Sequence, residues 1–157
     1  MVVRPQPPAC HLTSAGRRPR LSRVPIRVGI DLVAADSVEQ SLRAAHGERY
    51  LERVYTEREV EDCRTGAGID PERLAARFAA KEATLKVLSG EEGLALSTIE
   101  VCREPSGRVR IELSGRAAEI ANEAGIAELS ASLTHEAGFG AAVVIAEFRE
   151  AAGPRGV

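Results

Sequence analysis

The chain of 157 residues has few aromatic residues and no tryptophan. Phe and Tyr together make up only 3% of it, so a core must be built mainly from Ala, Val, Leu and Ile. The net charge of -2 provides no overall field that would favour nucleic acid, and no nucleic-acid partner is expected. No apolar run approaches the roughly 20 residues needed to span a bilayer, so no membrane anchor is expected. The length is sufficient for one domain with its own core.

Cysteine is also scarce, and its placement restricts the kinds of site it can form. The three cysteines, Cys10, Cys63 and Cys102, lie far apart in the sequence. Their odd number and the lack of metal-type spacing favour free thiols in a reducing compartment. We therefore expect a cytoplasmic protein.

The first 25 residues differ in composition from the rest of the chain. They contain five arginines, several prolines and no acidic residue, which favours a flexible basic extension over a folded segment. Arg17 and Arg18 are not followed by the apolar region of a twin-arginine signal. An organellar transit peptide matches the composition but not the required amphipathic period. Residues 26–149 are predicted to form the folded domain, and residues 150–157 a disordered tail.

Strand and helix patterns occur in both halves of this domain. Alternating apolar residues from Val24 to Leu32 predict a strand, with Asp31 near its end. Pro71 is expected in the first turn of a long helix. Apolar spacing, capping signals and turn residues predict helices at 37–45, 56–63, 71–89 and 116–124, and strands at 97–104, 108–113, 129–134 and 141–148. The predicted fold is α+β, an antiparallel sheet with one long helix packed across it.

The long helix carries charged residues beside its apolar face. Phe78, Glu82 and Lys86 follow one another at steps of four and therefore share a face. One interpretation is a surface Glu–Lys pair, which contributes ~0.2–0.5 kcal/mol. The other is a magnesium-binding carboxylate with a lysine one turn further on, both facing a phosphate.

Asp31 is a second carboxylate in an unusual place, within an apolar strand. Such a residue is commonly satisfied by a turn. However, Mg²⁺ is typically held by one or two carboxylates together with substrate oxygens. The occurrence of Asp31 upstream of Glu82 and Lys86 favours a magnesium-dependent reaction on a phosphate substrate.

Several segments, in the same order, resemble the holo-acyl-carrier-protein synthases, the short class of 4'-phosphopantetheinyl transferases. The resemblance covers roughly residues 27–148. The matching segments are Gly29-Ile30-Asp31, Tyr55-Thr56-Glu57-Arg58-Glu59, Arg77-Phe78-Ala79-Ala80-Lys81-Glu82-Ala83-Thr84-Leu85-Lys86, Gly93 to Val101, and Ser132-Leu133-Thr134-His135.

This resemblance implies transfer of phosphopantetheine from coenzyme A to a serine of an acyl-carrier protein of fatty-acid or polyketide type. It implies that Asp31 and Glu82 bind Mg²⁺, that Glu82 helps to activate the serine, and that Lys86 neutralises the leaving group. It also implies a homotrimer with its sites between subunits, for which the apolar strands of the second half are the expected contact. The residues expected near the coenzyme A phosphates are Arg77, Lys81, Lys86, Gly90, Thr134 and His135. Gly90 and Gly93 can equally serve as a helix C-terminal stop.

The sequence departs from the family pattern in two places. Ser37 stands where the family usually has an arginine that grips the carrier, although Arg43, Arg49 and Arg53 lie nearby. Val109 replaces a proline in the hairpin, which we interpret as structural. Two alternatives to the transferase are a non-catalytic module that binds the carrier or coenzyme A, and a coenzyme A pyrophosphatase. A binding module need not keep Asp31, Glu82 and Lys86 together, so their joint presence favours an enzyme.

Overall fold

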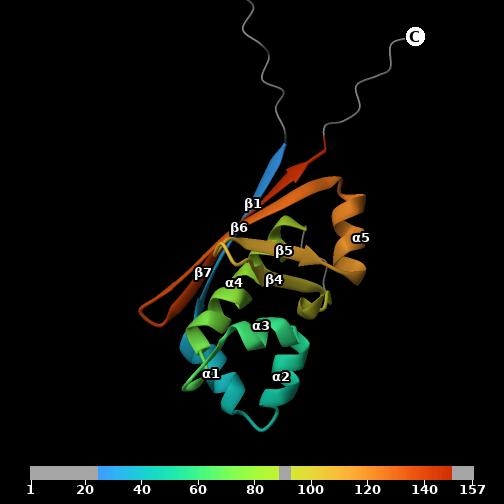
Figure 1. Ribbon diagram of the computed structural model, residues 1–157. Helices are drawn as coiled ribbons and strands as arrows, with labels where there is room; N and C mark the ends of the chain where they lie inside the picture. Colours follow the sequence, from blue (N-terminus) through green and yellow to red (C-terminus); the bar gives the residue numbers. More distant parts are fainter. Residues whose placement is uncertain (1–24, 89–92, 150–157) are drawn as a thin grey trace, which may run out of the picture.

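The structure, a computed structural model, describes residues 25–88 and 93–149. Its main element is a five-stranded antiparallel sheet in the order β1-β7-β6-β5-β4. Figure 1 shows the long helix α4 (Pro71–Val87) lying across this sheet. The α+β fold predicted from the sequence is therefore confirmed. The sheet strands are β1 (Ile26–Ala34), β4 (Ile99–Arg103), β5 (Val109–Leu113), β6 (Ile126–Glu136) and β7 (Phe139–Phe148).

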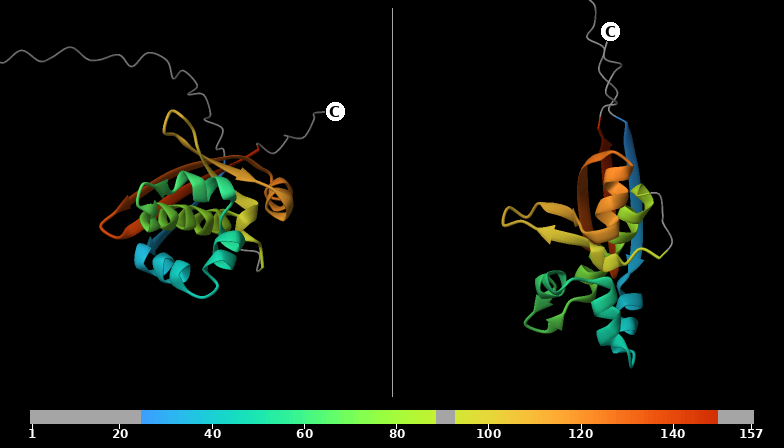
Figure 2. Two further views of the ribbon diagram at one scale, coloured as in Figure 1. Left: turned by 60° about the horizontal axis from the view of Figure 1, so that its bottom comes forward. Right: turned by 90° about the vertical axis from the view of Figure 1, so that its right-hand side faces the viewer.

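The remaining helices gather at two ends of the sheet. Helices α1, α2 and α3 lie together below it in Figure 1, and α5 lies beside the start of β6. The hairpin β4–β5 extends away from the body of the molecule (Figure 2). The bounds are α1 (Ala35–Arg43), α2 (Gly47–Val54), α3 (Glu57–Asp62) and α5 (Gly115–Glu123), with a 3-10 turn η1 (Leu96–Thr98) and a small hairpin of β2 (Arg64–Thr65) and β3 (Gly68–Ile69).

Helix α4 approaches the sheet so closely that two strand positions exclude a side chain. A Cβ added at Gly29 of β1 would lie 2.1 Å from the backbone oxygen of Ala83. A Cβ at Gly140 of β7 would lie 2.1 Å from the backbone nitrogen of Ala76. The alanine-rich face of α4 makes this approach possible, since small side chains let backbones come together. The contact at Gly29 places the Asp31 region of β1 directly against the Glu82 region of α4.

Local signals place the starts of α3 and α4 where the sequence predicted them, whereas α1 begins at Ala35, two residues earlier than predicted, and α2 was not predicted as a helix. The side chain of Asp70 accepts hydrogen bonds from the backbone N–H groups of Glu72 and Arg73, and Pro71 follows it in the first turn. Thr56 and Glu59 form a capping box at the start of α3, as predicted. These caps satisfy backbone groups that the helices themselves leave unpaired.

Several predicted boundaries need correction. β1 continues past Asp31 to Ala34, because its pairing with β7 extends to Phe139. Residues 97–98 belong to a 3-10 turn and not to the following strand. Between α3 and α4, residues 64–65 and 68–69 form the small hairpin β2–β3, for which no strands were predicted. Helix α4 ends at Val87, and Gly90, its predicted stop, lies outside the described residues.

One apolar face of the sheet is open to solvent in the single chain. The alternating side chains of β1 point away from α4, and the largest exposed fraction among them is 68% at Ile30. We call this surface the outer face, and its large exposed residues are Ile26, Val28, Ile30, Leu32 and Phe139. The expected subunit contact was placed on strands of the second half, but four of these five residues lie on β1. Among the described helices, none is both long and apolar enough to cross a membrane.

Candidate active site

Asp31 and Lys86 meet where β1 passes under the last turns of α4. The Lys86 ammonium lies 2.8 Å from Asp31 Oδ1 and also donates a hydrogen bond to the backbone oxygen of Ile30 at 2.6 Å. Asp31 is on the inner side of β1 because the strand period turns it away from Ile30 and Leu32. Both side chains keep contact with solvent, so a ligand can reach them.

Glu82 lies one helical turn before Lys86 and next to Asp31. Partial burial raises the pKa of the Glu82 carboxyl, and the negative charge of Asp31 raises it further, while Lys86 acts in the opposite direction. Two carboxylates therefore converge beside one ammonium group. The spacing of four between Glu82 and Lys86 and the contact at Gly29 together produce this convergence.

This arrangement fits a hard divalent cation. Magnesium prefers oxygen ligands and is often held by one or two carboxylates, with water and substrate phosphate completing the shell. After partial burial, the negative charge of Asp31 is the second cause that raises the pKa of Glu82, and a bound cation relieves such repulsion between carboxylates. These two residues are the ones that could hold the metal.

A second acidic group lies elsewhere, on the hairpin β4–β5. Ligand atoms of Glu100, Cys102 and Glu112 lie within 4.8 Å of one another. Glu100 already accepts a hydrogen bond from Thr56, and Glu112 is paired with Arg110. A buried thiol is also a poor ligand for magnesium. This group is separate from the Asp31–Glu82 pair.

Arg77 and His135 line a hollow of about 300 Å³ between α4 and the strands. Arg77 is only 8% exposed and is 3.4 Å from Asp62, but its Nε atom is buried without a hydrogen-bond partner. Such an atom normally has a partner in a folded protein. Arg73 and Arg103 line the same hollow, and we call it the arginine hollow. Three guanidinium groups and an imidazole around one space fit an anion such as a phosphate.

Sequence reasoning overlooked Arg73 and Arg103. Arg73 precedes Arg77 by four residues, so the shared helix face was a usable signal. Arg103 lies at the end of β4, and only the packing of that strand beside α4 brings it to the hollow.

Thr134 and His135 were expected to act together, but within one chain they point to opposite sides of the sheet. His135 pairs with Gly140 on the side of α4, whereas Thr134 pairs with Ala141 on the outer face. The strand period alone forces this separation of consecutive residues. Only His135 lines the arginine hollow of its own chain.

Lys81 does not lie in either site, which corrects the expectation that it contacts coenzyme A. It is fully buried, and its ammonium lies 2.8 Å from the equally buried carboxylate of Glu59. It also donates hydrogen bonds to the backbone oxygens of Leu96 and Ile99. These three partners account for all its donors, so none remains for a ligand in solvent.

Comparison with known proteins shows the family to which the chain belongs. Residues 27–143 match the model of the 4'-phosphopantetheinyl transferase superfamily. The chain belongs to this superfamily. It is 39% identical over 127 residues to a holo-[acyl-carrier-protein] synthase of Moorella thermoacetica, which covers 78% of this chain and 94% of that protein. A holo-[acyl-carrier-protein] synthase of Salinispora arenicola is 38% identical over 122 residues, and the match covers 78% of this chain and 98% of that protein.

The fold agrees with this assignment. The crystal structure of the Helicobacter pylori holo-[acyl-carrier-protein] synthase in complex with coenzyme A superimposes with a TM-score of 0.66 at 31% identity. The match covers 76% of this chain and 99% of that one. The resemblance seen in the sequence motifs is thus confirmed, and the chain is an enzyme of the transferase family.

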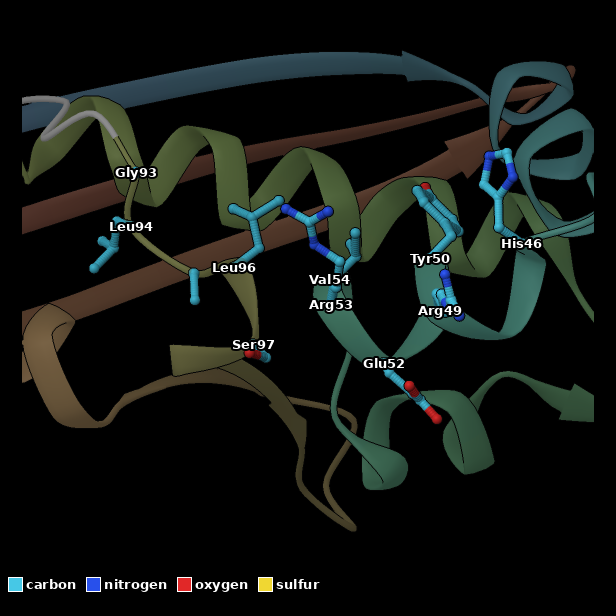
Figure 3. Close-up of a pocket in the computed structure, with 11 residues that line it drawn as sticks. His46, Arg49, Tyr50, Glu52, Arg53, Val54, Gly93, Leu94, Leu96 and Ser97 are labelled. Carbon is cyan, nitrogen blue, oxygen red and sulfur yellow. The ribbon is translucent and has the colours of Figure 1, made fainter.

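The transferase has a larger hollow of about 770 Å³ between α2 and residues 93–97 (Figure 3). We call it the α2 hollow. Leu94 and Leu96 line it from one side, and Arg49 and Arg53 approach it from α2. Within residues 25–88 and 93–149, these two arginines have no ion-pair partner. The α2 hollow therefore combines an apolar wall with two available cations.

Proposed function

We propose that this protein transfers 4'-phosphopantetheine from coenzyme A to a serine of an apo acyl-carrier protein, releases 3',5'-ADP and depends on Mg²⁺. The observation that carries the proposal is the convergence of Asp31 of β1 with Glu82 and Lys86 of α4, the helix that also supplies Arg77 to the arginine hollow. The synthase relatives and the coenzyme A complex of one of them support the same conclusion.

Each residue at the convergence has a distinct task in a direct phosphoryl transfer. Asp31 and Glu82 would hold the metal, which, when bound, neutralises charge on the pyrophosphate. Glu82 would accept the proton of the serine hydroxyl, directly or through a water molecule. Lys86 neutralises the leaving phosphate, for which it must exchange its contact with Asp31 for one with the substrate.

The arginine hollow is proposed to bind a phosphate group of coenzyme A other than the one that reacts. Arg77 has an unpaired buried Nε, and His135 faces the same space, so a phosphate there satisfies a donor that the free protein leaves unpaired. Arg73 and Arg103 add charge at its rim. Gly90, also expected near the phosphates, remains a prediction because it lies outside the described residues.

We further propose that the enzyme acts as a homotrimer with its sites between subunits. The outer face leaves large apolar side chains of β1 uncovered, and a neighbouring subunit is a suitable cover for them. Thr134 lies on this face and so is available to a site shared with a neighbour. The same side of the sheet that makes the contact thus carries a residue of the predicted phosphate site.

Carrier docking is proposed to use α2 in place of α1. On α1 the arginine expected by the family pattern is Ser37, and Arg43 is already paired with Glu39 at 2.6 Å. Arg49 and Arg53, in contrast, are available at the α2 hollow. Because Ser37 lacks the expected cation and Asp36 lies beside it, we expect weaker recognition of a strongly acidic carrier helix than of a less acidic one. The buried free thiols Cys63 and Cys102 accord with a cytoplasmic site of action.

Mass spectrometry of an apo acyl-carrier protein incubated with the enzyme, Mg²⁺ and coenzyme A tests the proposal. We expect the carrier to gain one phosphopantetheine group and 3',5'-ADP to appear in equal amount. Cleavage of coenzyme A without modification of the carrier would identify a pyrophosphatase instead. Binding of coenzyme A or carrier without any turnover, across both fatty-acid and polyketide carriers, would identify a binding module.

A further inference from the structure

Lys81 and Glu59 form a buried hub that joins separate parts of the transferase. Glu59 comes from α3 and Lys81 from α4, and neither has any exposed surface. The ammonium donates to the backbone oxygens of Leu96, at 3.0 Å, and of Ile99. The Glu59 carboxylate accepts from the backbone N–H groups of Thr56 and Val101, both at 2.8 Å. Two side chains thus connect α3, α4, the 3-10 turn η1 and β4.

Stability alone is a weak reason for such a pair. Burying two charges costs several kcal/mol per ion in solvation, and apolar side chains of similar volume often replace a buried pair without loss of stability. Desolvation lowers the pKa of Lys81 even though Glu59 acts to raise it, so the burial is a real cost to the charged form. What an apolar pair cannot reproduce is the directed hydrogen bonding to the Leu96 carbonyl and the Val101 N–H.

The tie to Leu96 has a functional location. Leu96 belongs to residues 93–97, the wall of the α2 hollow that faces Arg49 and Arg53 (Figure 3). Lys81 immediately precedes Glu82 in α4. One turn of this helix therefore carries both a residue of the hub and the carboxylate proposed to bind the metal. A shift of the hub therefore moves the wall of the α2 hollow relative to the reacting groups.

We infer that Lys81 and Glu59 are positioning residues for the carrier, because they hold the 93–97 wall at a set distance from Arg49 and Arg53 and from Glu82. This inference rests on the proposed function, in which the α2 hollow receives the carrier. Neither residue touches a substrate.

The test is the double substitution Lys81→Met with Glu59→Gln. The double substitution removes both charges. The amide oxygen of the introduced glutamine can still accept a hydrogen bond from one of the two backbone N–H groups, those of Thr56 and Val101, that Glu59 binds. We expect the KM for an apo acyl-carrier protein to rise roughly tenfold while the KM for coenzyme A changes less than twofold, since small displacements far from the chemistry reduce productive alignment. Hydrogen exchange at the amides of residues 96–98 should become about tenfold faster.

Tyr55→Phe is the matched control. It removes the hydroxyl that donates a buried hydrogen bond to the Leu74 carbonyl and keeps the ring that lies 5.9 Å from the Lys81 ammonium. It should lower the melting temperature and leave the KM for the carrier unchanged. If the double variant instead keeps wild-type exchange at residues 96–98 and a wild-type carrier KM, Lys81 and Glu59 are structural only and the inference is overturned.

A measurement on the unmodified protein covers the case in which the double variant does not fold. In native-state hydrogen exchange, the amide of Val101, which donates to Glu59, and the amides of residues 96–98 should open together with one free energy. Independent opening of the two groups would overturn the inference. Because this readout needs no turnover, it tests the tie between the hub and the 93–97 wall separately from the proposed function, which the carrier assay tests.

Discussion

The ammonium group of Lys86 forms an ion pair with Asp31 Oδ1 at 2.8 Å. The lysine proposed to neutralise the leaving phosphate is thus paired, in the free protein, with a carboxylate proposed to hold the metal. Glu82, one turn earlier on the same helix, has no ion-pair partner among the residues that the structure describes. If Asp31 and Glu82 hold a metal ion, that ion would compete with Lys86 for Asp31, and the ammonium would then be able to contact the leaving group. In the free protein, Lys86 neutralises the Asp31 carboxylate.

Asp31→Ala and Glu82→Ala should each reduce kcat/KM by roughly a hundredfold or more, because each removes a ligand of the ion that stabilises developing charge. Steady-state transfer to an apo-carrier, with and without excess EDTA, measures this. Glu39→Ala is the control, since Glu39 is a carboxylate of α1 paired only with Arg43. Full activity of the wild type in EDTA would contradict the magnesium assignment.

Glu82→Gln should raise the melting temperature at neutral pH while reducing transfer. Burial and Asp31 raise the pKa of Glu82 above its unfolded value, so the folded state binds the proton more tightly. Stability from this group is present at low pH and is lost as pH rises through the raised pKa. Melting curves from pH 4 to pH 7 without metal should therefore show a smaller loss for Glu82→Gln than for the wild type. An equal loss in both proteins would argue against a raised pKa.

Gly29→Ala should destabilise the fold by about 1–3 kcal/mol and lower kcat, because the new Cβ would meet the Ala83 backbone and push α4 away from Asp31. Urea unfolding and transfer kinetics measure the two effects. Gly66→Ala is matched to it, since a Cβ at Gly66 meets nothing within 4 Å. Equal behaviour of the two variants would show that the close approach of helix and strand is dispensable.

Ile30→Lys should convert the protein to monomers and abolish most transfer, because it places a charge in the centre of the outer face that a neighbouring subunit is proposed to cover. Light scattering coupled to size exclusion gives the mass. Ala45→Lys, on an exposed position after α1, should leave both mass and activity unchanged. A wild-type protein that is monomeric at micromolar concentration and fully active would contradict the trimer.

Ser37→Arg should lower the KM for a strongly acidic fatty-acid carrier by up to about tenfold at low salt, since one interfacial charge pair contributes on the order of 1 kcal/mol. The gain should shrink as ionic strength rises. Arg53→Ala should raise the same KM, because Arg53 lies at the α2 hollow without an ion-pair partner among the described residues. If neither substitution changes the KM, the carrier docks at another surface.

Local patterns in the sequence determined the helix and strand types and the beginnings of α3 and α4. Thr56, Asp70 and Pro71 act on backbone groups within a few residues, so their effect does not depend on the rest of the fold. The spacing of Glu82 and Lys86 likewise determined that both lie on one side of α4, because residues four apart share a helix face. The end of β1 was less predictable, because its length depends on pairing with β7, which follows more than 100 residues later.

Tertiary structure decided which charged residues lie inside and which face a ligand. Lys81 and Lys86 belong to one helix, yet one is buried against Glu59 and the other reaches Asp31. Thr134 faces the outer surface, and only the pairing of β6 with β7 in the sheet determines which side of the strand this is. The periodicity of a helix or strand determines the direction of a side chain relative to that element, but the partners of the side chain come from distant segments. For this protein, the sequence by itself predicted most of the elements and the grouping of Asp31, Glu82 and Lys86, whereas packing alone determined the hub, the arginine hollow and the outer face.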